Sequence, residues 1–179
     1  PFTPGAGTPP PELAGRQEIL DRAEILLKRI QKGRPSKSIL LTGLRGVGKT
    51  VLLNEINRMA RDLDYQTVQI EAHENKSLPA LLVPHLRSLL FALNRLEGTK
   101  EKVRRALAVL RSFVSSITIT YDDIPIGIDI EPEKGTADSG DLEADLAELF
   151  VIVGEAAVSR NASIVLLLVD ASWHQRPPP

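Results

Sequence analysis

One short stretch of the sequence has the residue types and spacing that suit phosphate binding. Residues 38–50 run from an apolar segment through a glycine-rich turn and match the pattern G-x-x-x-x-G-K-[ST]. In this pattern glycines let backbone N–H groups face a phosphate, lysine adds a positive charge, and a threonine hydroxyl can bind Mg²⁺. The alternative is a glycine-rich turn without a ligand, which the strand and helix patterns on either side disfavour. The expected contacts are Gly43, Leu44, Arg45, Gly46, Val47, Gly48, Lys49, Thr50 and Val51.

A second chemical feature lies near the end of the chain. Ile164–Val169 is a continuous apolar run that predicts a buried strand, and Asp170 follows it directly. A triphosphate site uses an acidic residue at such a strand end to help hold its metal, so Thr50 and Asp170 are the expected Mg²⁺ ligands. An acidic residue can also simply end a strand. A hydrolase would use a further carboxylate to activate water, and the next residue is Ala171.

Hydrophobic periodicity predicts the elements that position these residues. Alternating apolar and polar residues over 116–130 predict a β-hairpin, and Glu131–Gly140 is expected to be a loop. The proline- and glycine-rich residues 1–11 should form an extended lead-in. Strands are expected at Ile39–Thr42, Gln66–Ala72 and Ile164–Val169, and helices at Gln17–Lys32, 49–63, Leu78–Leu96, Lys100–Val114 and Asp141–Arg160.

Composition is that of an ordinary globular protein. The 179 residues are 42% hydrophobic and 25% charged, and none is cysteine, which excludes a disulfide framework and a thiolate metal site. Residues 1–111 have a net charge of +8 and residues 112–179 one of −9. A polyanion partner for the basic part is conceivable, but two solvated faces are the simpler interpretation. No signal peptide or membrane-spanning run is present, so a cytoplasmic location without membrane partners is expected.

The chain resembles a known family at three places. Leu13-Ala14-Gly15-Arg16-Gln17-Glu18, the glycine-rich loop, and the Leu-Leu-Leu-Val-Asp strand are similar to the AAA+ ATPases. Within that family the sequence resembles bacterial ATP-binding proteins with an origin-recognition-like ATPase domain, close to the signalling STAND group. The resemblance implies an α/β P-loop NTPase sandwich of three layers with a parallel sheet, and ATP or ADP with Mg²⁺ as the ligand. The resemblance also implies nucleotide contacts by Ala14, Gly15 and Arg16, because the corresponding segment of the family packs against adenine. Without the resemblance, this segment would be interpreted as a turn that leads into a helix.

The last residues depart from the family pattern. The family would continue after Asp170 with a glutamate, a sensor strand, an arginine finger and a helical lid, and residues 171–179 match none of these. We therefore expect residues 12–170 to be the N-terminal part of a truncated ATP-binding domain, with 171–179 as an aberrant unstructured tail. The sheet is expected to be incomplete, because the sensor strand would separate Ile39–Thr42 from Ile164–Asp170. Those two strands would then flank a vacant position or pair directly.

These observations leave several functions open. The leading hypothesis is an ATP-binding module whose hydrolysis is lost in the chain as given. A second is a non-hydrolysing module in which nucleotide orders the fold for a partner, and Ala171 favours it. A P-loop kinase or GTPase is less favoured, since Asn75-Lys76-Ser77-Leu78 lacks the aspartate that would read guanine. Self-association, and a DNA or protein partner reached through further C-terminal parts, remain open.

Overall fold

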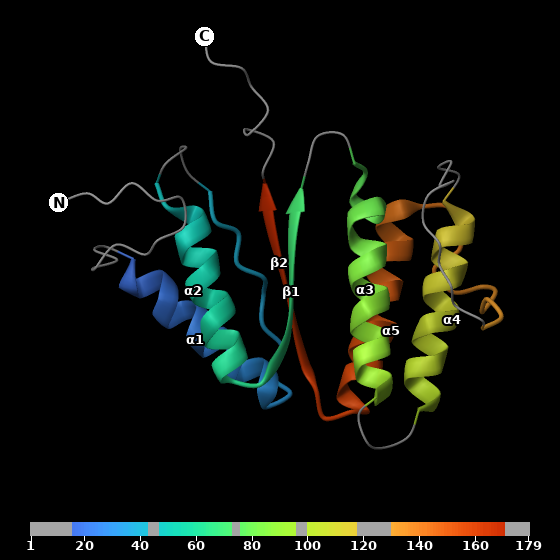
Figure 1. Ribbon diagram of the computed structural model, residues 1–179, viewed down its shortest axis with the longest axis horizontal. Helices are drawn as coiled ribbons and strands as arrows, with labels where there is room; N and C mark the ends of the chain where they lie inside the picture. The colour runs from blue at the N-terminus through green and yellow to red at the C-terminus, as the bar shows by residue number, and fades with distance from the viewer. Residues whose placement is uncertain (1–15, 43–46, 73–75, 96–99, 118–129, 171–179) are drawn as a thin grey trace, which may run out of the picture. The chain divides into compact units, whose positions relative to one another are not determined.

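The computed structural model describes residues 16–42, 47–72, 76–95, 100–117 and 130–170 (Figure 1). The chain divides into two compact units, with the boundary between Thr67 and Val68. The elements are the helices α1 (Gln17–Gln31), α2 (Lys49–Asp62), α3 (Leu78–Arg95), α4 (Glu101–Ser116) and α5 (Leu142–Val158), and the strands β1 (Tyr65–Ala72) and β2 (Ser163–Asp170).

The first unit is built on the packing of α1 against α2. Each helix buries residues three or four positions apart, so each presents one apolar stripe to the other. Tyr65, just after α2, is also buried, and its hydroxyl donates a 2.7 Å hydrogen bond to the carbonyl oxygen of Leu27. This bond ties the start of β1 to α1. The buried residues of the two helices are Leu20, Ala23 and Leu27 on α1, and Leu52, Ile56 and Ala60 on α2.

Helix α1 ends in a Schellman motif centred on Gly33. Gly33 has a φ of 67°, and its N–H donates to the carbonyl oxygen of Ile30 at 2.9 Å. The N–H of Arg34 donates to the carbonyl oxygen of Arg29 at 3.0 Å, which completes the motif. A left-handed residue is required here, and glycine adopts this conformation without a steric cost. The helix therefore stops where the glycine and the following Pro35 predict.

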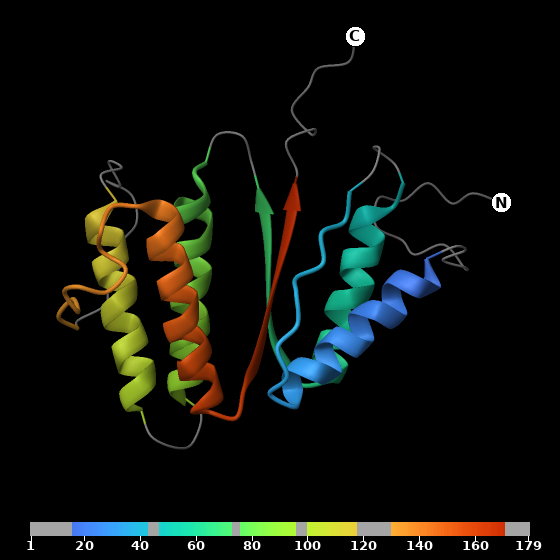
Figure 2. The same cartoon turned by 180° about the vertical axis from the view of Figure 1, so that it is seen from behind.

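The second unit holds the sheet and three helices. β1 and β2 are hydrogen-bonded neighbours that run in the same direction (Figure 1). The helices α3, α4 and α5 pack against one another, and α5 also contacts β2. Figures 1 and 2 show the three helices on one side of this strand pair. One apolar cluster joins them, with Leu86, Leu90, Phe113, Leu149 and Ile70 among its fully buried members.

The ends of α5 are held by specific polar contacts. Asp141 is the N-cap, and its carboxylate accepts from the N–H groups of Glu143 and Ala144 at 3.0 and 3.1 Å. Beyond the other end, the buried Arg160 donates to the carbonyl oxygens of Leu93 at 3.1 Å and Asn94 at 3.3 Å. These carbonyls belong to the last turn of α3, where helix carbonyls lack partners within the helix. Arg160, which follows α5, thus provides hydrogen-bond donors for carbonyl groups at the end of α3.

Most of the predicted elements are confirmed within one or two residues, as is the α/β class. The predicted strand Ile39–Thr42 is wrong, because residues 34–42 have no regular secondary structure. A strand needs a hydrogen-bonded neighbour, and no other described residue forms a backbone hydrogen bond with residues 36–42. Direct pairing of 39–42 with 164–170 is also absent from the sheet of the described residues, which contains β1 and β2. The hairpin predicted in 116–130 falls largely on residues 118–129, outside the described ranges, as do the lead-in and the 171–179 tail.

Among the described residues, no helix combines the length and the apolar character that crossing a bilayer would require.

A buried carboxylate makes the second unit sensitive to acid. Asp145 is 2% exposed and accepts hydrogen bonds from the Ser139 hydroxyl at 2.7 Å, the Ser139 N–H at 3.1 Å and the Gly140 N–H at 2.9 Å. Burial alone would raise the pKa of Asp145, but these three hydrogen bonds outweigh it and lower the pKa below its ordinary value. A carboxyl group with a lowered pKa in the folded state adds stability above its unfolded pKa of about 4. That stability is lost as the pH falls through the folded pKa.

We expect Asp145→Asn to lower the free energy of unfolding at neutral pH by about 1–3 kcal/mol, since it removes the anionic acceptor of three hydrogen bonds. Denaturant unfolding across pH checks this, and the difference from the wild type should shrink as the pH falls below about 4. Glu131→Gln, an exposed change in the same loop, is the control and should have little effect. A difference that stays constant over the whole pH range would exclude the charge of Asp145 as its source.

Candidate functional site

The candidate site is the N-terminal end of α2. The helix begins at Lys49, and its N-cap Gly48 has φ 79° and ψ 28°, in the left-handed region. Glycine is the residue that adopts this conformation readily, so its place in the motif has a direct backbone reason. The predicted contacts Gly43, Leu44, Arg45 and Gly46 lie outside the described residues.

The start of α2 has the electrostatics of an anion site. The first N–H groups of a helix have no partner within the helix and carry a partial positive charge. No side chain at the N-cap accepts from them, and no acidic residue occupies the first turn. Lys49 and Thr50 are the first two residues of the helix, and the Thr50 side chain is exposed. This end can therefore accept an anion.

The structure brings Arg16 to the same place. Arg16 is the N-cap of α1, where its carbonyl oxygen accepts from the N–H groups of Ile19 at 3.1 Å and Leu20 at 3.2 Å. Its guanidinium group lies against Gly48: a Cβ atom added to Gly48 would be 3.1 Å from Cζ of Arg16 and nearer still to Nη1. A cationic side chain is thus held at the positive end of α2.

This contact is one that sequence reasoning missed. The family resemblance implied a role for Arg16 through its backbone, beside Ala14 and Gly15, which are outside the described part of the chain. The guanidinium reaches Gly48 because α1 and α2 pack along their apolar stripes, which places the first residues of both helices together. The sequence shows that residue 16 is cationic. The position of its guanidinium group depends on the angle between α1 and α2, which the sequence pattern does not give.

The two predicted metal ligands belong to different units. Thr50 lies in the first unit, and Asp170 is the last residue of β2 in the second. The structure describes each unit by itself, and the Asp170 side chain is outside what it describes. Within the described residues, no group of three or more His, Cys, Asp or Glu side chains is placed to hold a metal ion. Of the two apolar contacts predicted around Lys49, Val47 is 38% exposed and Val51 is half-buried.

Gly48 offers a test of this geometry. Gly48→Ala should lower the free energy of unfolding by about 1–2 kcal/mol, because alanine in the left-handed region is strained. Gly33→Ala is the matched control: it has the same strain at φ 67° but nothing within 4 Å of the new Cβ. If Gly48→Ala lowers the free energy of unfolding more than Gly33→Ala does, the difference measures the contact of the new Cβ with Arg16. That difference should disappear when Gly48→Ala is combined with Arg16→Ala. Denaturant unfolding of the four variants decides, and an unchanged stability of Gly48→Ala would contradict the left-handed N-cap.

Comparison with known proteins identifies the family of the chain. A family model described as "AAA ATPase domain" matches residues 12–176, a range that contains every helix and strand of the structure. No curated protein and no solved structure matches the chain. Because the family model covers more than half of the sequence, the chain belongs to the AAA ATPase domain family.

Proposed function

We propose that this chain binds an adenine nucleotide with Mg²⁺ at the N-terminal end of α2. The observation that carries the proposal is the placement of the Arg16 guanidinium against Gly48, at the first turn of that helix. Arg16, Lys49 and the helix end are all positive, and no acidic residue in the first turn offsets them. A polyphosphate is the kind of ligand that suits such a concentration of positive charge.

The roles we assign follow the residue types. The backbone from Gly43 to Gly48 surrounds the phosphates, and Lys49 and Arg16 supply charge for them. Val47, Val51, Ala14 and Gly15 complete the nucleotide contacts by family resemblance. Thr50 and Asp170 provide the oxygen ligands that Mg²⁺ prefers, and the ion would neutralise phosphate charge. Membership of the AAA ATPase domain family supports the choice of nucleotide.

We assign adenine rather than guanine as the base. The stretch from Asn75 to Leu78 is similar to a guanine-reading motif, but leucine stands where that motif has an acidic residue. The segment around Gly15 and Arg16 resembles the adenine-packing segment of the origin-recognition-like and STAND-like members. We therefore propose that the chain is related to those subgroups. A cytoplasmic location and a DNA or protein partner are further parts of the proposal.

We further propose that the chain binds nucleotide without hydrolysing it at an appreciable rate. Ala171 follows Asp170, where the family has a glutamate to activate water, and an alanine side chain cannot act as a general base. The same residue favours the second candidate function, a module whose nucleotide orders the fold for a partner. In either case binding, rather than turnover, is the property to measure first.

Lys49→Ala should weaken ATP binding by about 1.5–3 kcal/mol, the range for hydrogen bonds to charged groups, and Arg16→Ala by a similar amount. Isothermal titration calorimetry of the full chain with Mg²⁺-ATP measures the affinity, and Mg²⁺-GTP should bind less tightly. Lys32→Ala removes an exposed lysine at the C-terminal end of α1, the opposite end of that helix from Arg16, and serves as the control. Equal affinities of the wild type and Lys49→Ala would reject the site.

Steady-state ATP hydrolysis by the wild-type chain should be negligible. A general base contributes roughly 10²–10⁴-fold to a rate, so Ala171→Glu should raise any residual turnover if the base is what is missing. A phosphate-release assay with Lys49→Ala as the background control checks both statements. Turnover by the wild type that Lys49→Ala abolishes would contradict the proposal of a non-hydrolysing chain.

A further inference from the structure

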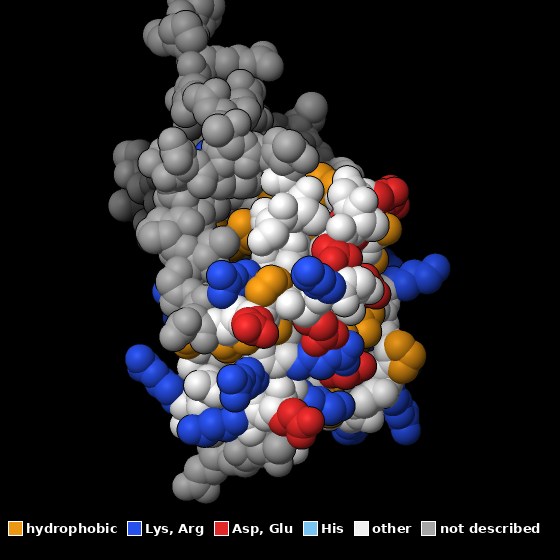
Figure 3. Space-filling model, turned by 90° about the vertical axis from the view of Figure 1, so that its right-hand side faces the viewer, with side chains coloured by type: hydrophobic (Ala, Val, Ile, Leu, Met, Phe, Trp, Pro, Cys, Tyr) orange, Lys and Arg blue, Asp and Glu red, His pale blue; other side chains and the backbone are white. Residues whose placement is uncertain are grey.

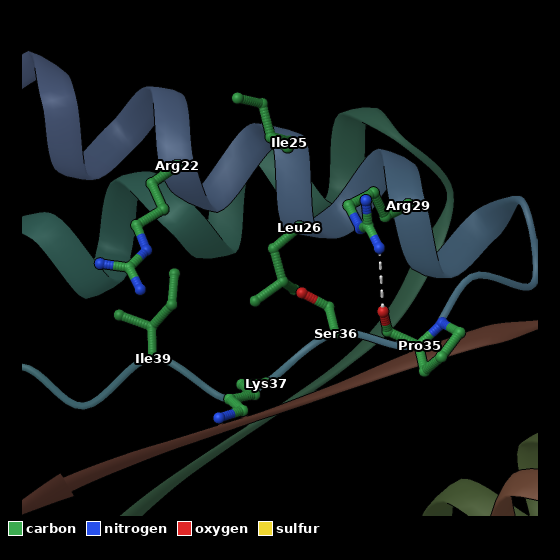
Figure 4. Close-up of a pocket in the computed structure, with 8 residues that line it drawn as sticks. All are labelled: Arg22, Ile25, Leu26, Arg29, Pro35, Ser36, Lys37 and Ile39. Carbon is green, nitrogen blue, oxygen red and sulfur yellow. Dashed lines mark hydrogen bonds between the residues drawn. The ribbon is translucent and has the colours of Figure 1, made fainter.

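The first unit contains a groove whose lining is both positive and aliphatic. It has a volume of about 590 Å³ and lies between α1 and the extended segment 35–39 (Figure 4). None of the described residues to which we assign nucleotide contacts lines it. Its charged and aliphatic lining residues are Arg22, Ile25, Leu26 and Arg29 on α1, and Lys37 and Ile39 on the extended segment.

Helix α1 also has a second polar face, on which the charges are already paired. Residues three or four positions apart lie on one face of a helix. On this face Gln17 donates to the Asp21 carboxylate at 2.8 Å, and Lys28 forms an ion pair with Glu24 at 2.5 Å. Two carboxylates of α1 are therefore engaged with their own neighbours, away from the groove.

The cations of the groove have no carboxylate partner within the described part of the chain. The Arg29 guanidinium donates to the carbonyl oxygen of Pro35 at 3.3 Å (Figure 4). Arg22 and Lys37 form no ion pair with the described residues, and this includes Glu18, one turn before Arg22. An anionic ligand can therefore approach these cations without displacing an internal carboxylate.

The face over α4 shows how the charges of a solvated surface are arranged in this protein. Cations and carboxylates are interspersed there (Figure 3), as in the 3.0 Å pair of Arg105 and Glu133. In the groove, by contrast, three cations lie together, and no carboxylate is among its described lining residues. The groove therefore favours a partner with several negative charges.

The aliphatic side chains of the groove indicate what else the partner carries. Leu26 lies between the two arginines, and Ile39 lies across from α1 on the extended segment (Figure 4). Both are half-buried, and Ile25 at the rim is 60% exposed. Covering these side chains with apolar groups of a partner is favourable, whereas phosphate groups gain nothing from them. The described lining holds no aromatic side chain on which the bases of a single-stranded nucleic acid could stack.

We propose that this groove binds an acidic segment of a partner protein in which aliphatic side chains lie between the carboxylates. Arg22 and Arg29 are two helical turns apart, about 10 Å along α1. Carboxylates have the same separation two turns apart on a helix, or three positions apart in an extended peptide, at about 10 Å. They pair with the arginines and Lys37, while the aliphatic side chains between them contact Leu26 and Ile39. Nucleotide is not required for this contact, and added salt weakens it by screening the charges.

The test is a titration of a fluorescent peptide with the full chain in the absence of nucleotide, followed by fluorescence anisotropy. The peptide has about twelve residues and repeats Glu-Leu-Ile-Glu, so its glutamates recur at both of the separations above. The expected result is saturable binding that salt weakens. A peptide that repeats Glu-Ser-Ser-Glu keeps the charge without the aliphatic side chains, and one that repeats Lys-Leu-Ile-Lys reverses the charge. Each should bind roughly tenfold more weakly or less.

Variants of the chain assign the binding to the groove. Arg22→Glu/Arg29→Glu should weaken binding of the Glu-Leu-Ile-Glu peptide roughly tenfold or more. The matched control Lys28→Glu/Arg61→Glu makes the same change in net charge at exposed residues of the same unit that do not line the groove, and should leave binding unchanged. The groove variant should also gain saturable binding of the Lys-Leu-Ile-Lys peptide. That gain excludes misfolding as the cause of the loss.

Three results would overturn the proposal: no saturable binding of the Glu-Leu-Ile-Glu peptide, equal binding of the Glu-Ser-Ser-Glu peptide, or an equal loss in the groove and control variants. Tighter binding of a single-stranded oligothymidylate of the same length, dependent on Arg22 and Arg29, would assign the groove to nucleic acid and overturn it as well.

Discussion

The left-handed backbone of Gly48 is the constraint on which the candidate site depends. α2 can begin at Lys49 because the residue before it adopts positive φ, and the direction of the helix follows from that turn. The apolar stripe of α2 then packs against the stripe of α1, and the Tyr65 hydroxyl adds a hydrogen bond to the carbonyl oxygen of Leu27 on α1. Arg16 arrives at Gly48 as a result of this packing. One backbone conformation and one helix interface thus explain how a cation, a helix end and a glycine come together.

The second unit relies on buried polar groups as well as on its apolar core. Asp145 fixes the residues just before α5, and Arg160 joins the chain after α5 to the end of α3. The segment 131–140 is held to α4 by the Ser112 hydroxyl, which donates to the carbonyl oxygen of Glu133 at 2.6 Å. Such groups are costly to bury unless they are paired, so each specifies one arrangement of the backbone around it.

The sequence predicts the elements better than it predicts their contacts. The buried stripe of α1 and the apolar run of β2 were visible as periodicity, and both formed where expected. Residues 39–42 have the composition of a strand, but composition does not show whether another strand pairs with them. Without such a partner they have no regular secondary structure, and Leu40 is 85% exposed. The Arg16 to Gly48 contact depends on how α1 packs against α2, which no local pattern predicts. The hydrogen bonds of Asp145 are local, to residues five and six positions earlier, but they depend on the turn that the chain makes before α5. The loop chemistry from Gly43 to Gly46 remains a prediction from residue types.

The pairing of β1 with β2 has a consequence for the order in which the second unit assembles. β1 ends at Ala72 and β2 begins at Ser163, so the parallel pair closes a loop that contains all three helices of the unit. Closing a flexible loop of that length costs about 4 kcal/mol of chain entropy, before the constant term that every closure carries. α3 and α4 are neighbours in sequence and meet cheaply, and α5 then brings Ser163 close through Arg160 and the turn after it. We therefore expect the strands to pair late in folding, after the helices have shortened the path between them.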